Sequence, residues 1–312
     1  MPSAIRLDAA ERLQDLQGYG DQPPHPHWPE KARLALSIVL NIEEGAESHL
    51  LDGDAAAEYL NSDMRCDPWP DRRNLNLESH YEYGSRVGAW RLLDLFRERN
   101  IPITVFAVAQ ALQRVPKIAN RIVEDCHEIA AHGWRWLDYR DVSPQVEAEH
   151  MQQAMATITE LTGQRPLGWY TGRVSQATRK LVINDGGFLY DSDAYNDDLP
   201  YWVQHDQGHH LVVPYSFDTN DMRFASSPGF DTGNDWLNYL TDTFDCLYRE
   251  GARQPRMMSV GLHCRLAGRP GRLMALERFL DHVAKHQDVW VTRRVDIARH
   301  WHEHHSPVSA TV

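Results

Sequence analysis

The chain has 312 residues, of which 42% are apolar and 24% charged, so it is long enough and apolar enough to bury a substantial core. Its 44 acidic and 32 basic residues give a formal net charge of −12, which argues against nucleic acid or an anionic membrane as a partner. The four cysteines form no C-x-x-C pair, no secretory signal is evident, and no apolar run approaches the roughly 20 residues of a membrane span. Reduced thiols and a cytoplasmic location are therefore expected.

The first predicted element is an extended N-terminal arm over residues 1–30. Residues 23–29 read Pro-Pro-His-Pro-His-Trp-Pro, and this density of proline prevents a helix or a central strand. A single domain is expected over residues 31–312, because no repeat, low-complexity tract or convincing boundary interrupts that part of the chain.

Eight short apolar runs follow, each typical of a strand that is buried on both faces. They cover residues 34–40, 101–108, 128–131, 167–171, 188–191, 211–216, 257–263 and 289–292. Helices are predicted between many of them, at residues 87–96, 144–162, 236–248 and 273–286, the second beginning after Ser143 and ending before Gly163. This alternation predicts an α/β fold with a closed or nearly closed parallel barrel, and an open doubly wound sheet is the alternative.

Residues 47–82 are polar and irregular, which indicates a long insertion after the first strand, close to the mouth of the barrel. The chain contains neither G-x-G-x-x-G nor G-x-x-x-x-G-K-[ST]. A nucleotide cofactor is therefore not expected.

Polar and aromatic side chains follow five of the predicted strands directly. These stretches are residues 41–45 (Asn-Ile-Glu-Glu-Gly), 132–136 (His-Gly-Trp-Arg-Trp), 169–173 (Trp-Tyr-Thr-Gly-Arg), 218–221 (Asp-Thr-Asn-Asp) and 263–265 (His-Cys-Arg). The carboxyl ends of parallel strands converge at one end of a barrel, so we expect a functional site there.

Two carboxylates and two histidines are the catalytic candidates. Of Glu43 and Glu44, one could take a proton from water while the other holds the water or a substrate N–H; a solvated strand end is the alternative. His132 and His263 each end an apolar strand, and the alternative for both is a hydrogen-bonded structural role. The histidines within residues 300–305 are instead expected to form a solvated helix end.

At these residues the chain resembles the NodB-type polysaccharide deacetylases, whose fold is a distorted (β/α) barrel. Where that family has T-F-D-D, this chain has Asn-Ile-Glu-Glu at residues 41–44. Where the family has H-[ST]-x-x-H, the chain has His132 but Trp136 at the second histidine position, and residues 262–263 resemble the late leucine–histidine motif. A zinc site needs at least three ligands and tryptophan offers none, so we expect no catalytic metal and no other cofactor.

This combination is similar to one branch of the superfamily, the metal-independent bacterial allantoinases of the PuuE type. The similar stretches are residues 23–29, 82–86, 168–173, 189–193, 197–202, 218–224, 261–265 and 296–302. The resemblance implies a homotetramer that hydrolyses the hydantoin ring of allantoin to allantoate in purine degradation. Ile42 and Ala46 stand where tyrosine and glycine are expected, and both border the carboxylate pair, so they bear on substrate preference.

The resemblance also implies a role for each candidate residue. Glu43 aligns with the base aspartate of the deacetylases, and we expect partial desolvation to raise its pKa. Glu44 takes the vacated metal-ligand position, where it could hold the water or a substrate N–H, and His132 and His263 remain for the oxyanion and the leaving nitrogen. The substrate-binding residues are expected to be Trp136 and Tyr170, which suit a flat ring, Arg173 and Arg265, whose planar forks suit carbonyl oxygens, and Asn220.

Two other functions stay open. One is a metal-dependent N-deacetylase of an acetylated sugar, against which the missing metal ligands argue. The other is a non-catalytic relic of the fold that only binds a metabolite. Turnover of allantoin by metal-stripped protein separates the three functions.

Overall fold

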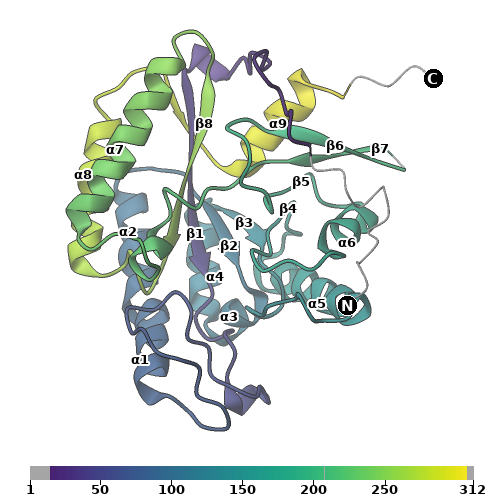
Figure 1. The fold of residues 1–312 in the computed structure, drawn as a ribbon, viewed down its shortest axis with the longest axis vertical. Helices are drawn as coiled ribbons and strands as arrows, with labels where there is room; N and C mark the ends of the chain where they lie inside the picture. The colour runs from purple at the N-terminus through teal and green to yellow at the C-terminus, as the bar shows by residue number, and fades with distance from the viewer. Residues whose placement is uncertain (1–14, 207, 308–312) are drawn as a thin grey trace, which may run out of the picture.

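Nine strands form one curled sheet in the computed structural model, which describes residues 15–206 and 208–307 (Figure 1). The strands are β1 (Leu34–Ile42), β2 (Thr104–Ala107), β3 (Glu128–Ala131), β4 (Gly168–Trp169), β5 (Tyr190–Asp191), β6 (Tyr201–His205), β7 (Gly208–Val212), β8 (Arg256–His263) and β9 (Val289–Val291). The predicted arm falls partly outside the described residues, because its residues 1–14 are not among them.

Helices connect most of these strands. They are α1 (Leu75–Tyr83), α2 (Ala89–Glu98), α3 (Ala109–Arg114), α4 (Pro116–Glu124), α5 (Pro144–Thr162), α6 (Thr178–Asp185), α7 (Gly233–Glu250), α8 (Pro270–Val283) and α9 (Arg294–His304). Shorter helical segments are a π-helix at Gly84–Gly88 and 3-10 turns at Pro29–Lys31, Leu50–Asp52 and Asp221–Phe224.

The strand order in the sheet is β6-β7-β5-β4-β3-β2-β1-β8, and β9 pairs with the start of β1. Every pairing is parallel except that of the hairpin β6–β7. Within the described residues, the two sides of the sheet meet at a single bridge between Asn220 and Gly261 rather than along paired strands. The expected distorted (β/α) barrel is thus confirmed, with an incomplete seam beside β8.

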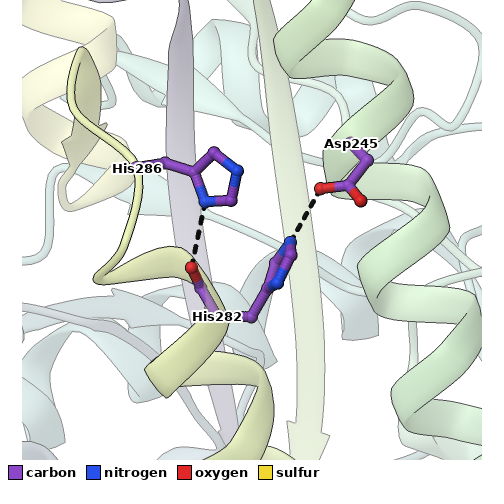
Figure 2. A group of neighbouring side chains, drawn as sticks. All are labelled: Asp245, His282 and His286. Carbon is purple, nitrogen blue, oxygen red and sulfur yellow. Dashed lines mark hydrogen bonds and ion pairs between the residues drawn. The ribbon is translucent and has the colours of Figure 1, made fainter.

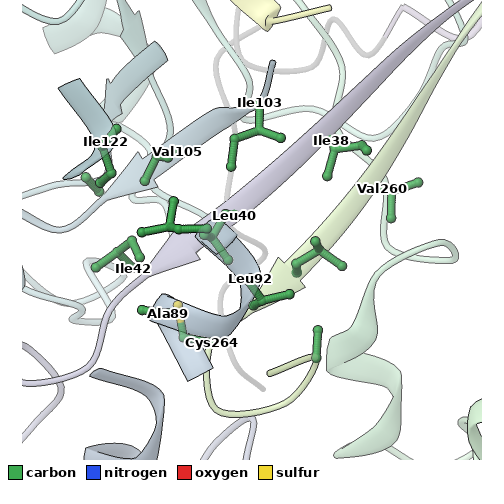
Figure 3. Close-up of a cluster of buried hydrophobic side chains, with 14 of the residues drawn as sticks. Ile38, Leu40, Ile42, Ala89, Leu92, Ile103, Val105, Ile122, Val260 and Cys264 are labelled. Atoms are coloured by element: carbon green, nitrogen blue, oxygen red, sulfur yellow. The ribbon is translucent and has the colours of Figure 1, made fainter. Parts of the chain in front are cut away.

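The alternation of side chains along β1 sorts the core into two layers. Ile38, Leu40 and Ile42 point outward and join a cluster with α2 residues such as Leu92 (Figure 3). Val39 faces the interior of the barrel, in a separate cluster of aromatic residues from the neighbouring strands. All nine residues of β1 are buried, because β2 and β8 flank the strand and its two faces are both covered.

Local signals account for several helix boundaries. The Ser143 side chain accepts a hydrogen bond from the Val146 N–H at 3.3 Å, and Gly163 ends α5 with φ of 73°, so the predicted bounds of this helix are confirmed. Helix α8 begins earlier than predicted because Pro270 occupies its first turn, and it ends at Val283, so residues 284–286 lie beyond it.

Three predictions about secondary structure were incomplete. The insertion at residues 47–82 contains α1, whose first turn is capped by the Asn74 side chain accepting from the Leu77 N–H at 3.3 Å. Strand β6 was not predicted, because its residues are at most half-buried and its apolar stretch, Tyr-Trp-Val, is only three residues long. Regular pairing in the run 211–216 stops at Val212, shortly before Pro214, which has no N–H to donate.

The described part of the arm packs on the amino-terminal end of the barrel. The Trp28 indole N–H donates to the Arg256 carbonyl at 3.0 Å, and the Nε2 atoms of His300 and His305 lie 2.7 and 3.0 Å from the Pro26 carbonyl. The prediction of a solvated histidine tail holds for His302 and His304, which are exposed, and is wrong for His300 and His305, which hold the arm. No helix among the described residues is both long and apolar enough to cross a membrane.

Candidate active site

The carboxyl ends of the strands surround a cavity of about 460 Å³. Of the nine candidate residues, those that line it are Glu43, His132, Trp136, Tyr170, Arg173, Asn220 and His263. Side chains between Tyr59 and Cys66 close the cavity from the other side, so the insertion lies at the barrel mouth as expected. A larger hollow of about 550 Å³ lies beside the start of β8 and contains none of the candidates, so we place the chemistry in the smaller cavity.

Glu43 is the buried centre of the polar network in this cavity. It follows β1 directly, and its side chain lies 2.8 Å from the Arg265 guanidinium, 3.3 Å from His132 Nε2 and 3.6 Å from His263 Nε2. Burial alone would raise the pKa of Glu43, but the positive charges of His263 and Arg265 outweigh it and hold that pKa well below its usual range. The expectation of a raised pKa was wrong, because cations surround this carboxylate.

His263 is held by a carboxylate that was not among the candidates. Its Nδ1 lies 2.7 Å from Asp221 Oδ1, while Asp221 Oδ2 accepts the backbone N–H groups of His263 and Ala267 at 2.8 and 2.9 Å. Burial lowers the pKa of His263, but the charges of Glu43 and Asp221 raise it to about 9. His263 is therefore an imidazolium at neutral pH, with its Nε2–H directed toward Glu43.

Sequence reasoning missed Asp221, although the signal was present. The stretch 218–221 was recognised as a polar strand end, and only Asn220 was selected from it. A fully buried aspartate one residue further is the group that a strand-end histidine needs as a partner.

The tautomer of His132 follows from its neighbours. Its Nδ1 lies 3.2 Å from the Tyr170 carbonyl oxygen, which can only accept, so Nδ1 carries a proton. Its Nε2 faces Glu43 at 3.3 Å. The ring of His132 is therefore oriented by Tyr170, which directly follows β4, so that Nε2 faces the Glu43 carboxylate.

Glu44 and Arg265 lie behind the cavity wall rather than in it. Strand alternation turns Glu44 away from Glu43 and toward the π-helix. Glu44 packs so closely on Gly84 that a side chain at that position would place its Cβ atom 2.3 Å from Glu44 Oε1. Arg265 is fully buried, with its Nη1 3.1 Å from Glu44 Oε1 and its Nη2 2.8 Å from Glu43 Oε2. We expected Glu44 to hold the water or a substrate N–H, and Arg265 to bind the substrate. Both expectations were wrong, because the two carboxylates bind the Arg265 guanidinium instead.

Trp136 and Arg173 form one wall of the cavity together. The Arg173 guanidinium lies 4.0 Å from the centre of the Trp136 ring, and its Nη1 and Nη2 contact Glu58 and the Trp136 carbonyl at 2.9 and 2.8 Å. Tyr170 belongs to the inner aromatic cluster, where it stacks on Phe106 with a centroid distance of 4.5 Å. Trp136 and Arg173 are therefore placed to face a substrate, whereas Tyr170 forms part of the floor.

Asn220 contributes to the site by donating a hydrogen bond to the Tyr215 hydroxyl. Asn220 Oδ1 accepts from the Met222 N–H and Asn41 Nδ2 donates to the Leu262 carbonyl, so the orientation of both amides is fixed by backbone partners. Each amide then donates to the Tyr215 hydroxyl at 3.2 Å. With both lone pairs occupied, the Tyr215 hydroxyl has its own proton left to donate, and this side chain lines the cavity.

Comparisons with known proteins agree with this geometry. Residues 77–186 match the polysaccharide deacetylase family. A Schizosaccharomyces pombe protein whose name places it among the polysaccharide deacetylases is 40% identical over 94% of this chain and 98% of its own. The chain belongs to the polysaccharide deacetylase family. Within the family, crystal structures of a Pseudomonas aeruginosa protein of the same family name and of PuuE allantoinase are each 56% identical, cover 94% of this chain and 98% of theirs, and have TM-scores of 0.92.

The residues at the metal position of the polysaccharide deacetylase family do not fit a resident ion. Glu44 is bound to Arg265, His132 Nε2 is directed to Glu43, and Trp136 carries no ligand atom. The Arg265 guanidinium, within 3.1 Å of both carboxylates, supplies the positive charge that a metal would bring.

The two positions that depart from the PuuE branch lie outside the cavity wall. Ile42 and Ala46 are both buried in the outer apolar cluster. Neither is among the residues that line the cavity, so their effect on substrate preference would have to act through packing.

Proposed function

We propose that this hydrolase is a metal-independent allantoinase, which opens the hydantoin ring of allantoin to allantoate in purine degradation. The observation that carries the proposal is the buried Arg265 guanidinium, which bridges Glu43 and Glu44 at the family's metal position. The 56% identity to PuuE allantoinase over 94% of the chain supports the choice of substrate.

Hydrolysis of a cyclic amide requires two proton transfers and the stabilisation of one oxyanion, and we assign one side chain to each. The imidazolium of His263 gives a proton to the departing ring nitrogen, Glu43 takes a proton from the attacking water, and the Tyr215 hydroxyl donates to the oxygen on which negative charge develops. Transfer of the His263 proton removes one of the charges that hold the pKa of Glu43 low. Glu43 accepts its proton in the earlier attack step, and the loss of this charge then lets it hold that proton more firmly as the leaving group departs.

The test of the proposed function is turnover of allantoin by protein treated with a chelator, followed by the appearance of allantoate. Full activity after treatment is expected. Loss of activity that added zinc restores would support a metal-dependent deacetylase-like reaction instead, and tight binding of allantoin without turnover would indicate a non-catalytic relic.

The pH dependence of kcat/KM is expected to show a basic limb near pH 9 and no acidic limb from Glu43 in the neutral range. His263 has a raised pKa of about 9, so its acid form is present below that pH and is lost above it. The low pKa of Glu43 keeps it ionised well into the acid range. Initial rates at subsaturating substrate across this range, with circular dichroism to confirm folding, provide the measurement.

Tyr215→Phe is expected to lower kcat by about 10²-fold, the lower end of the effect of losing one oxyanion donor. The substitution keeps the ring, and burial already raises the pKa of Tyr215, so the hydroxyl acts as a neutral donor. Tyr195→Phe is the matched control, because its hydroxyl contacts Tyr170 at 3.0 Å and the residue does not line the active-site cavity. Equal kcat in both variants would remove Tyr215 from the mechanism.

The expected homotetramer and the absence of nucleic-acid and membrane partners stay predictions. Light scattering on the purified protein measures the oligomeric state directly.

We propose a small neutral hydantoin as the ligand because the cavity combines an aromatic wall at Trp136 with directed hydrogen-bond donors.

A further inference from the structure

A second group of candidate ligands lies on the outer helices, apart from the active-site cavity (Figure 2). Asp245 comes from α7, His282 from α8, and His286 from the turn that follows α8. Among the residues that the structure describes, this is the only set of three His, Cys, Asp or Glu ligand atoms that all lie within 4.8 Å of one another. None of the three lines the active-site cavity.

Within the described part of the chain, His286 makes its hydrogen bond through Nδ1, which leaves the lone pair of Nε2 available to this group. Its Nδ1 lies 3.0 Å from the His282 carbonyl oxygen, which can only accept, so Nδ1 carries the proton. The other ring nitrogen, Nε2, points to the side on which Asp245 lies (Figure 2). A backbone carbonyl that accepts from one ring nitrogen is the usual support of a histidine that binds metal through the other.

His282 and Asp245 are close enough to share an ion. His282 Nε2 lies 2.7 Å from Asp245 Oδ1, joined by one proton. Bonds of about 2.05 Å in a tetrahedral site separate ligand atoms by about 3.3 Å, so an ion would replace that proton after a small opening of the pair. The two side chains are 27% and 50% exposed, which leaves room for entry and for a water ligand.

We propose that Asp245, His282 and His286 form a site for a divalent transition-metal ion of the Zn²⁺ class. Two imidazoles and one carboxylate suit zinc, and water would complete the coordination. The ion would join α7 to α8 across 37 residues of sequence. Its role is to stabilise the helix pair outside β8, and it takes no part in hydrolysis.

The chain contains a natural comparison for this site. His300 and His304 have the same spacing on α9, with His304 Nδ1 3.0 Å from the His300 carbonyl. His300 Nε2 is already engaged by the Pro26 carbonyl at 2.7 Å, and no third ligand within 4.8 Å completes a set among the described residues. Histidine spacing alone therefore does not define the proposed site.

Calorimetric titration of chelator-treated protein with zinc tests the proposal. One equivalent is expected to bind. Free zinc at about 100 times Kd should lower the equilibrium constant for unfolding about 100-fold, which raises Tm by a few degrees. The double variant His282→Asn/His286→Asn should lose both effects, and His304→Asn should keep them. The absence of one-equivalent binding, or its persistence in the double variant, would overturn the site.

Two further measurements separate this site from the active-site cavity. Glu43→Gln should bind zinc as the parent does, and the double variant should keep the parental kcat on allantoin without added metal. Loss of zinc binding in Glu43→Gln would place the ion in the cavity and overturn the proposal. Cobalt absorption of the parent, absent from the double variant, would report tetrahedral coordination at the outer helices.

Discussion

Glu43→Gln is expected to lower kcat for allantoin by about 10²–10⁴-fold while the variant still binds substrate. The amide keeps the shape of the side chain, but it cannot accept a proton from water. It also removes the charge at the centre of the network formed by His132, His263 and Arg265. Steady-state kinetics together with calorimetric binding of allantoin measure the two effects separately.

Glu47→Gln is the matched control for this prediction. Glu47 lies in the same loop and is almost fully buried, but it accepts from the Gly45 N–H and does not line the cavity. Glu43→Gln leaves the buried Arg265 guanidinium with Glu44 as its one carboxylate partner among the described residues, which will lower stability, so the melting temperature of each variant must be known. A folded Glu43→Gln variant with kcat within a few-fold of the parent would require another base.

Asp221→Asn is expected to lower kcat/KM by about 10⁴-fold, as when a catalytic histidine loses the carboxylate that orients it. The substitution removes one of the two negative charges that raise the pKa of His263. The imidazolium is then less favourable, so the pKa of His263 falls. The basic limb of the pH profile should move from near pH 9 to lower pH in the residual activity.

The shift of the pH profile distinguishes an electrostatic role of Asp221 from a structural one. Asp218→Asn is the control, since Asp218 lies in the same loop but is exposed and contacts Ser216 and Tyr239. It should leave the basic limb in place. An unchanged basic limb in Asp221→Asn would show that His263 is not the acid, and His263→Asn should then keep most of the activity.

Much of the barrel could be predicted from the sequence, because most of its strands are short, apolar and separated by helices. The β6–β7 hairpin was only partly predicted, since the apolar stretch of the half-buried β6 is only three residues long. The candidate residues could be found by their position after strands, because the carboxyl ends of parallel strands meet in space. Seven of the nine do line one cavity.

The different surroundings of Glu43 and Glu44 could in principle have been read from strand parity. Val39 faces the interior and Leu40 the outer helices, so Glu43 continues the inner face and Glu44 the outer one. His263 pairs in register with Asn41, which places it on the same inner face. Nothing in the local sequence, however, indicates the charge that each carboxylate meets.

By itself, the sequence determined the family, the barrel and the set of polar groups at its mouth, because local periodicity and motif spacing encode them. Tertiary structure decided the electrostatics. The Arg265 guanidinium binds a carboxylate pair more than 200 residues away, and the Asp221 carboxylate binds the His263 ring across 42 residues. Protonation depends on charges within a few ångströms and on burial, and only the folded chain brings those charges together.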